Sequence, residues 1–333
     1  MSISTLNQAR EVISGKQPLD IENSFSAAKV CARALRSPQE ERTAREVVIR
    51  ALDDWNQLHS ETYTLWNDIV ESAGLYPYLN ADVLSDSALL RLEYNKSMHL
   101  QDVYFHEEQN DLAFKLLAGK SIVLSAPTSF GKSLLIQEIV ASKKYRNIVI
   151  IQPTLALLDE TRKKLHKYRQ HYKIIVSTTQ KPSEHNGNIY LFTGERVVEY
   201  PYFDNINFFI IDEFYKLSLS REDDRAIVLN HALHKLLRFT NKFYLLGPMI
   251  KSIPGTLREK YELEWINTSF ATVAVDEIKY PPEQTKKEED RRRALFNLLI
   301  ELNEPTLIYC AAPQRATDIA IEFVRFIIEN KSK

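Results

Sequence analysis

Residues 125–133, which read SAPTSFGKS, have the types and order of a loop that binds nucleotide phosphates. In such loops consecutive backbone N–H groups wrap the phosphates, a lysine reaches the terminal ones, and a hydroxyl binds Mg²⁺. Lys132 and Ser133 would supply the last two groups, and Ala126 stands where the motif usually opens with glycine. The stretch therefore predicts a phosphate site. The alternative is an ordinary strand–turn–helix with a surface lysine.

A second candidate is the acidic pair Asp212-Glu213, which ends the apolar run in INFFIIDEFYKL. An aspartate at the tip of a buried strand can hold Mg²⁺, and a neighbouring glutamate can position and deprotonate an attacking water. Acidic residues also end strands as solvated caps, but a pair downstream of a phosphate loop indicates a nucleoside triphosphatase. We therefore predict that Lys132, Asp212 and Glu213 are catalytic and that Ser133 and Asp212 bind the metal.

The elements that must position these residues follow from the hydrophobic pattern. Apolar runs without polar alternation predict strands that are buried on both faces of a parallel sheet. These runs are SIVLSA, NIVIIQP, KIIVSTT, NIYLF, INFFIID and KFYLLGP. Helix-like stretches such as LLIQEIVASKK separate several of them, so the sequence predicts a doubly wound α/β fold. The phosphate loop would then lie at a helix N-terminus, where the helix dipole favours an anion.

The α/β pattern is flanked by two segments of different character. Residues 1–100 contain helix-like segments without a catalytic constellation, so we expect a packed all-α accessory domain there. In its clearest helix, SPQEERTAREVVIRALDDWNQL, Ser37 and Glu40 are expected to form a capping box. Residues 101–270 hold the α/β pattern, and residues 271–333 begin with a linker around Pro281-Pro282. After the linker, RRALFNLLIEL and QRATDIAIEFVRFII predict helices on either side of a strand, PTLIYCAA.

Bulk composition limits the choice of partners and compartments. A chain of 333 residues suits two or three domains, and its formal net charge of −1 means that a nucleic acid must be met by a local basic face. Cys31 and Cys310 are the only cysteines and lie far apart, which favours a reducing compartment. The start of the chain lacks a signal-peptide core, and no apolar run approaches about 20 residues. We expect a cytoplasmic protein that does not enter a membrane.

With both motifs placed, residues 101–325 resemble the first RecA-like domain of a superfamily 2 DExD/H-box helicase and the start of the second. The resemblance implies ATP and Mg²⁺ as ligands. It assigns Gln109 to the adenine edge, with Phe105 as a stacking neighbour. It also implies that the phosphate loop binds through a set of residues within motif I: Thr128, Ser129, Gly131, Lys132 and Ser133.

The same resemblance places a nucleic-acid strand along two further motifs. QPTLALLDETRKKL resembles motif Ia and assigns Pro153, Thr154 and Arg162 to the nucleic-acid backbone. NIYLFTGERV resembles motif Ib and assigns Thr193, Gly194 and Arg196 to the same strand. PTLIYCAAPQRATDIA resembles motif IV, which implies that residues 271–333 contain a linker and the beginning of a truncated second RecA-like domain.

Three departures from the family pattern concern coupling and hydrolysis. Tyr215 occupies the fourth position of the DExx box, and Gly247-Pro248-Met249 replaces the usual Ser-Ala-Thr of motif III. The chain also contains no Gly-Arg dipeptide, so the arginine fingers of motif VI are missing. Because loss of such a finger costs about 10³-fold or more in rate, we expect this chain to bind ATP and to hydrolyse it slowly or not at all.

The function predicted from these patterns is an ATP-dependent helicase or translocase that acts on single- or double-stranded DNA or RNA. The variant IDEFYK also resembles antiphage defence helicases such as that of the Hachiman system. Two alternatives stay open: an ATP-gated binding or scaffold module that never unwinds, and a restriction-type translocase subunit that moves on duplex. The helical N-terminal region is the expected site for a protein partner.

Overall fold

The computed structural model describes residues 3–15, 17–218, 224–248, 250–253, 255–276, 288–302 and 305–331. Its contacts divide the chain into two compact units, Met1–Ala274 and Val275–Lys333. The predicted linker at Pro281-Pro282 lies outside the described residues. The three predicted domain ranges stay a prediction, since the first unit holds both the helical region and the α/β region.

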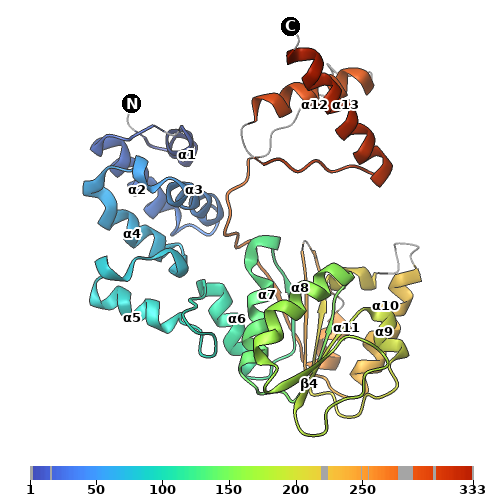
Figure 1. The fold of residues 1–333 in the computed structure, drawn as a ribbon. Coiled ribbons are helices and arrows are strands. Elements are labelled where there is room, and N and C mark those ends of the chain that lie inside the picture. Colours follow the sequence, from blue (N-terminus) through green and yellow to red (C-terminus); the bar gives the residue numbers. More distant parts are fainter. Residues whose placement is uncertain are drawn as a thin grey trace. The chain divides into compact units, whose positions relative to one another are not determined.

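The chain begins with helices, as predicted (Figure 1). Their bounds are α1 Leu6–Ser14, α2 Ile21–Ala34, α3 Glu41–Asp53, α4 Tyr63–Ser72 and α5 Asp86–Tyr94. The predicted capping box at Ser37 is wrong, because α3 begins only at Glu41. Residues 37–40 form turns in which the Ser37 carbonyl accepts from the N–H groups of Glu40 and Glu41, while its hydroxyl donates to Gln39.

A seven-stranded parallel sheet follows, in the order β3-β4-β2-β5-β6-β1-β7. The strand bounds are β1 Ile122–Ser125, β2 Asn147–Ile151, β3 Tyr172–Ile175, β4 Gly187–Phe192, β5 Phe208–Asp212, β6 Phe243–Gly247 and β7 Glu264–Asn267. The six predicted strands are confirmed. The seventh, with the sequence EWIN, escaped prediction because it is a short edge strand that is only half-buried.

Two layers of helices cover the sheet. They are α6 Glu107–Leu117, α7 Lys132–Ala141, α8 Leu155–Leu165, α9 Gly194–Glu199, α10 Asp224–Leu237 and α11 Gly255–Tyr261. Successive strand residues point to opposite faces. On β5, Phe208 and Ile210 join a core with α6, α7 and α8, whereas Phe209 and Ile211 join a separate core with α9 and α10. Burial on both faces explains why these strands are apolar throughout.

The N-terminal helices share the first of these two cores. Val47 of α3 and Trp66 of α4 belong to the same cluster of buried side chains as Leu112 of α6 and Ile139 of α7. A buried hydrogen bond reinforces this continuity, because Ser97 Oγ donates to the Glu138 carboxylate at 2.6 Å. The helical region is therefore packed as one body with the face of the sheet that α6, α7 and α8 cover.

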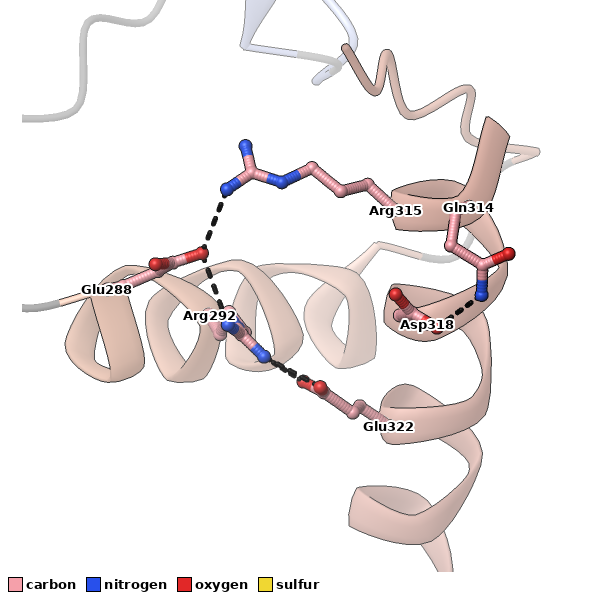
Figure 2. A network of polar contacts seen from close by, with 6 residues as sticks. All are labelled: Glu288, Arg292, Gln314, Arg315, Asp318 and Glu322. Carbon is pink, nitrogen blue, oxygen red and sulfur yellow. Dashed lines mark hydrogen bonds and ion pairs between the residues drawn. The ribbon is translucent and has the colours of Figure 1, made fainter. Parts of the chain in front are cut away.

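The second unit contains α12 Glu288–Glu301 and α13 Pro313–Lys331, which match the two predicted helices. Figure 2 shows that Glu288 on α12 pairs with Arg292 and Arg315, and that Arg292 also pairs with Glu322 of α13 at 2.6 Å. The strand predicted for PTLIYCAA is wrong for the described residues, which are irregular there. Leu307 and Tyr309 are 98% and 93% exposed, as expected where no neighbouring strand pairs with the segment.

Candidate nucleotide and nucleic-acid site

The phosphate loop lies between the end of β1 and the start of α7, as the sequence predicts. Ala126 is buried, and its N–H donates to the Gly247 carbonyl at 3.1 Å. This residue therefore continues the hydrogen bonding of β1 with β6 at the carboxyl end of the two strands. Ala126 does not have a positive φ, so alanine at this position carries no backbone strain. Gly131 is the residue that needs glycine, because its φ of 78° is left-handed and it precedes the first turn of α7.

Lys132 and Ser133 occupy the first turn of α7, where helix N–H groups are unpaired and favour an anion. The Lys132 ammonium donates to the carbonyls of Ala126 at 3.2 Å and Pro127 at 2.7 Å. Burial lowers the pKa of Lys132, while the charges of Asp212 and Glu213 act in the opposite direction. The lysine is thus held over the loop, and the acidic pair is near enough to influence its charge.

The acidic pair stands at the carboxyl end of β5. Burial raises the pKa of Asp212, and hydrogen bonds from Gln152 Nε2 at 3.4 Å and from the Glu213 N–H at 2.9 Å oppose that rise. Glu213 has a φ of 54°, a left-handed conformation that costs a non-glycine residue about 1–3 kcal/mol. Its carboxylate pairs with Lys216 at 2.5 Å. The two neighbouring carboxylates thus have different partners: Asp212 contacts Gln152 at the end of β2, and Glu213 pairs with Lys216.

Gln109 has a structural role that the sequence did not predict, because its side chain links α6 to the phosphate loop. Its Oε1 accepts from the His106 N–H at 2.9 Å, and its Nε2 donates to the Phe130 carbonyl at 2.5 Å, so this buried amide ties α6 to the phosphate loop. The predicted adenine contact stays a prediction. Phe105 is buried at 1% exposure, and its role as a stacking neighbour also stays a prediction.

A surface pocket brings three of the predicted nucleic-acid residues together with Asp212. Its lining comes from the carboxyl ends of β2, β4 and β5 and from α10: Ile151, Gln152, Pro153, Thr193, Gly194, Glu195, Asp212, Lys216, Arg225, Ala226 and Leu229. Pro153, Thr193 and Gly194 are thus brought next to Asp212. The carboxyl edge of a parallel sheet is where α/β proteins bind their ligands.

The other predicted nucleic-acid residues lie outside this lining. Thr154 caps α8 by accepting from the Leu157 N–H at 3.3 Å. Arg196 donates to the Val176 carbonyl at 2.8 Å, and Arg162 pairs with Asp159 at 2.7 Å. Their nucleic-acid roles stay predictions.

Several residues of this region were not predicted. Gln152 contacts Asp212 and directly precedes Pro153, and its buried Oε1 has no hydrogen-bond partner among the described residues. Lys216 and Arg225 bring positive charge to the pocket. The sequence signal for Gln152 was its position at the end of a predicted strand, whereas Arg225 reaches the pocket only through the packing of α10.

Two of the departures from the helicase pattern contact each other. A Cβ atom placed on Gly247 would lie 3.1 Å from Tyr215 Cδ1, tighter than an ordinary van der Waals contact. Tyr215 therefore occupies space that a larger motif III residue would need. Of the predicted motif III triplet, Met249 lies outside the described residues.

Two segments of the chain match known protein families. Residues 107–243 match the family described as DEAD/DEAH box helicase. The chain contains a DEAD/DEAH box helicase domain. Residues 1–89 match a second family, described as the anti-bacteriophage protein B N-terminal domain. The helicase resemblance seen in the sequence is confirmed, and ATP and Mg²⁺ are the ligands that such domains generally bind.

A curated relative agrees with the match to the anti-bacteriophage protein B N-terminal domain. Anti-bacteriophage protein B of Escherichia coli is 33% identical over 314 residues, which cover 91% of this chain and 43% of that protein's length. The chain thus spans less than half of the relative that it matches. A solved structure of S. cerevisiae Dbp5 bound to Nup159, Gle1, IP6 and ADP is similar over 70% of this chain and 65% of that one, at 14% identity and a TM-score of 0.43. Within the described residues, no helix is long and apolar enough to cross a membrane.

Proposed function

We propose that this chain is the ATP-binding part of an ATP-dependent nucleic-acid helicase or translocase that works in antiphage defence in the cytoplasm. The observation that carries the proposal is that the candidate nucleotide site and the candidate nucleic-acid pocket adjoin at the carboxyl ends of the strands. Lys132 and the Asp212-Glu213 pair stand there beside the pocket lined by Pro153, Thr193 and Gly194. The similarity to anti-bacteriophage protein B supports the defence role.

The residues of the loop fit a nucleoside triphosphate. The N–H groups at the start of α7 and the Lys132 ammonium would bind its phosphates. The Ser133 hydroxyl and the Asp212 carboxylate offer the hard oxygen ligands that Mg²⁺ prefers. The metal would neutralise phosphate charge. Glu213 would hold and deprotonate the attacking water.

A shared wall between the two sites supports coupling of hydrolysis to movement on a strand. Gln152 donates to the Asp212 carboxylate and directly precedes Pro153. A displacement of Asp212 at the nucleotide site would therefore move Pro153 at the pocket for the strand. The alternative function, an ATP-gated binding module, is favoured by the packing of Tyr215 over Gly247. That contact replaces the polar side chains which the helicase family uses at these positions.

Turnover of ATP with and without DNA or RNA tests the proposal. We expect the slow turnover of the chain to fall by a further factor of about 10² or more in Glu213→Gln, because the substitution removes the general base. Glu184→Gln is the matched control, since Glu184 is exposed and precedes the amino end of β4, whereas Glu213 follows the carboxyl end of β5. Strand displacement that Glu213→Gln abolishes would support the helicase, whereas ATP-dependent binding without displacement would support the module. Equal turnover of both variants would contradict the role of Glu213.

A further inference from the structure

The segment that follows β7, residues 268–272, lies against the phosphate loop. The Thr272 hydroxyl donates to the Ser129 carbonyl at 2.8 Å, and the Thr272 N–H donates to the Ser129 hydroxyl at 3.5 Å. Phe270 contacts Phe130 edge to face, with ring centroids 6.3 Å apart. Both rings are buried at 1% exposure. Two successive residues of the loop are therefore held by one segment.

The helical N-terminal region holds the same segment from its other side. The Arg45 guanidinium of α3 lies 4.1 Å from the centroid of the Phe270 ring. Its own position is fixed, because Arg45 Nε donates to the Ala73 carbonyl at 3.0 Å and the side chain pairs with Glu41. The His106 ring approaches Phe270 to 5.6 Å between centroids. Phe270 is thus enclosed by side chains from α3, from the start of α6 and from the loop.

Arginine is an unusual residue at a buried position such as that of Arg45 unless its positive charge makes a specific interaction there. It is buried at 6% exposure, and a buried guanidinium is costly unless it is paired and hydrogen-bonded. A desolvated cation is attracted strongly to the face of an aromatic ring, so the ring contact is among the stronger interactions available to Arg45. The contact links the helical region directly to the residue that touches Phe130.

We infer that Arg45 and Thr272 are positioning residues of the nucleotide site. They hold residues 129–130 so that the loop presents its N–H groups before a nucleoside triphosphate arrives. The helical region is then a component of the nucleotide site. This inference rests on the proposed nucleotide binding. Its physical basis is preorganisation, because a loop that is already ordered loses less conformational entropy when its ligand binds.

Replacing the Thr272 hydroxyl tests the loop contact with little change in shape. We expect Thr272→Val to weaken binding of a fluorescent ATP analogue about threefold to tenfold, the effect of one hydrogen bond. Thr272→Ser keeps the hydroxyl and is expected to bind like the unchanged chain. The thermal midpoint of both variants should remain within a few degrees of the unchanged chain, which separates positioning from unfolding.

Arg45→Met tests the helical contribution, and Arg50→Met is its matched control. Both arginines lie on α3, and both form an ion pair with the glutamate four residues before them. Both substitutions should lower the thermal midpoint, but only Arg45→Met should also weaken ATP affinity, by about tenfold.

Each outcome of these measurements decides the inference. Weaker binding by Thr272→Val and Arg45→Met, with normal binding by Thr272→Ser and Arg50→Met, would support it. Unchanged affinity of Thr272→Val and Arg45→Met, in an assay where Lys132→Ala loses binding, would overturn the inference and leave the proposed function intact. Failure of the unchanged chain to bind the analogue would overturn both.

Discussion

Gly131→Ala is the substitution whose cost follows most directly from the loop geometry. Gly131 has a φ of 78°, and a side chain in this left-handed region costs about 1–2 kcal/mol. A Cβ atom there would also overlap Gln109 Nε2 in its present position. To make room, Gln109 must release the Phe130 carbonyl that it holds at 2.5 Å. A buried acceptor left without its partner costs about 1–3 kcal/mol, so the sum is about 2–5 kcal/mol.

The assay is a double-mutant cycle by urea unfolding. Gly131→Ala is measured in the unchanged chain and in a Gln109→Ala background, where the overlapping amide is gone. In that background we expect only the backbone cost of about 1–2 kcal/mol, so the two substitutions should be coupled by about 1–3 kcal/mol. An equal cost of Gly131→Ala in both backgrounds would refute the contact between Gln109 and the loop. A negligible cost in both would refute the left-handed conformation as well.

Three further predictions concern buried polar groups. Burial lowers the pKa of His106 from 6.5 to about 4, so the unfolded chain binds more protons between these values and stability is lost as the pH falls through this range. The loss is about 2 kcal/mol at pH 5, and His106→Asn should reduce the difference between urea unfolding at pH 7 and pH 5 by that amount; an unchanged difference would contradict the assignment. The Tyr244 hydroxyl is buried without a hydrogen-bond partner among the described residues, so Tyr244→Phe should leave the free energy of unfolding equal or about 1 kcal/mol higher, and a clear decrease would reveal a missed partner. Ser97→Ala should lower the free energy of unfolding by about 2–3 kcal/mol, because it removes the hydroxyl bonded to buried Glu138, and a thermal midpoint like that of the unchanged chain would argue against this hydrogen bond.

Much of the α/β region could be predicted because its strands are buried on both faces. Such strands are apolar at every position, as in FFIID of β5, and the chemistry-bearing residues come directly after them. The same reasoning missed β7, because its residues Glu264–Asn267 form a half-buried edge strand with mixed polarity. It also predicted a strand at PTLIYCAA, although strand formation depends on a pairing neighbour that local composition does not reveal.

Local capping rules were less reliable than strand patterns. Ser37 has the right type and spacing for a helix cap, but its carbonyl closes a turn first and α3 starts at Glu41. Residues that act across the fold gave no local signal at all. Arg45 and Phe270 are far apart in the sequence, and only packing brings the guanidinium over the ring. The same holds for Gln109, whose hydrogen bond to the phosphate loop depends on how α6 packs against α7.

We propose that the loop from Ser125 to Ser133 binds a nucleoside triphosphate through Lys132. Calorimetric titration of the chain with ATP and Mg²⁺ tests it most directly, alongside Lys132→Ala and the control Lys173→Ala, which alters an exposed lysine on β3. We predict saturable binding by the unchanged chain and by Lys173→Ala, and an affinity at least about tenfold weaker for Lys132→Ala, since the ammonium pairs with phosphate charge. Equal affinity of Lys132→Ala and the unchanged chain, or no binding by either, would contradict the account.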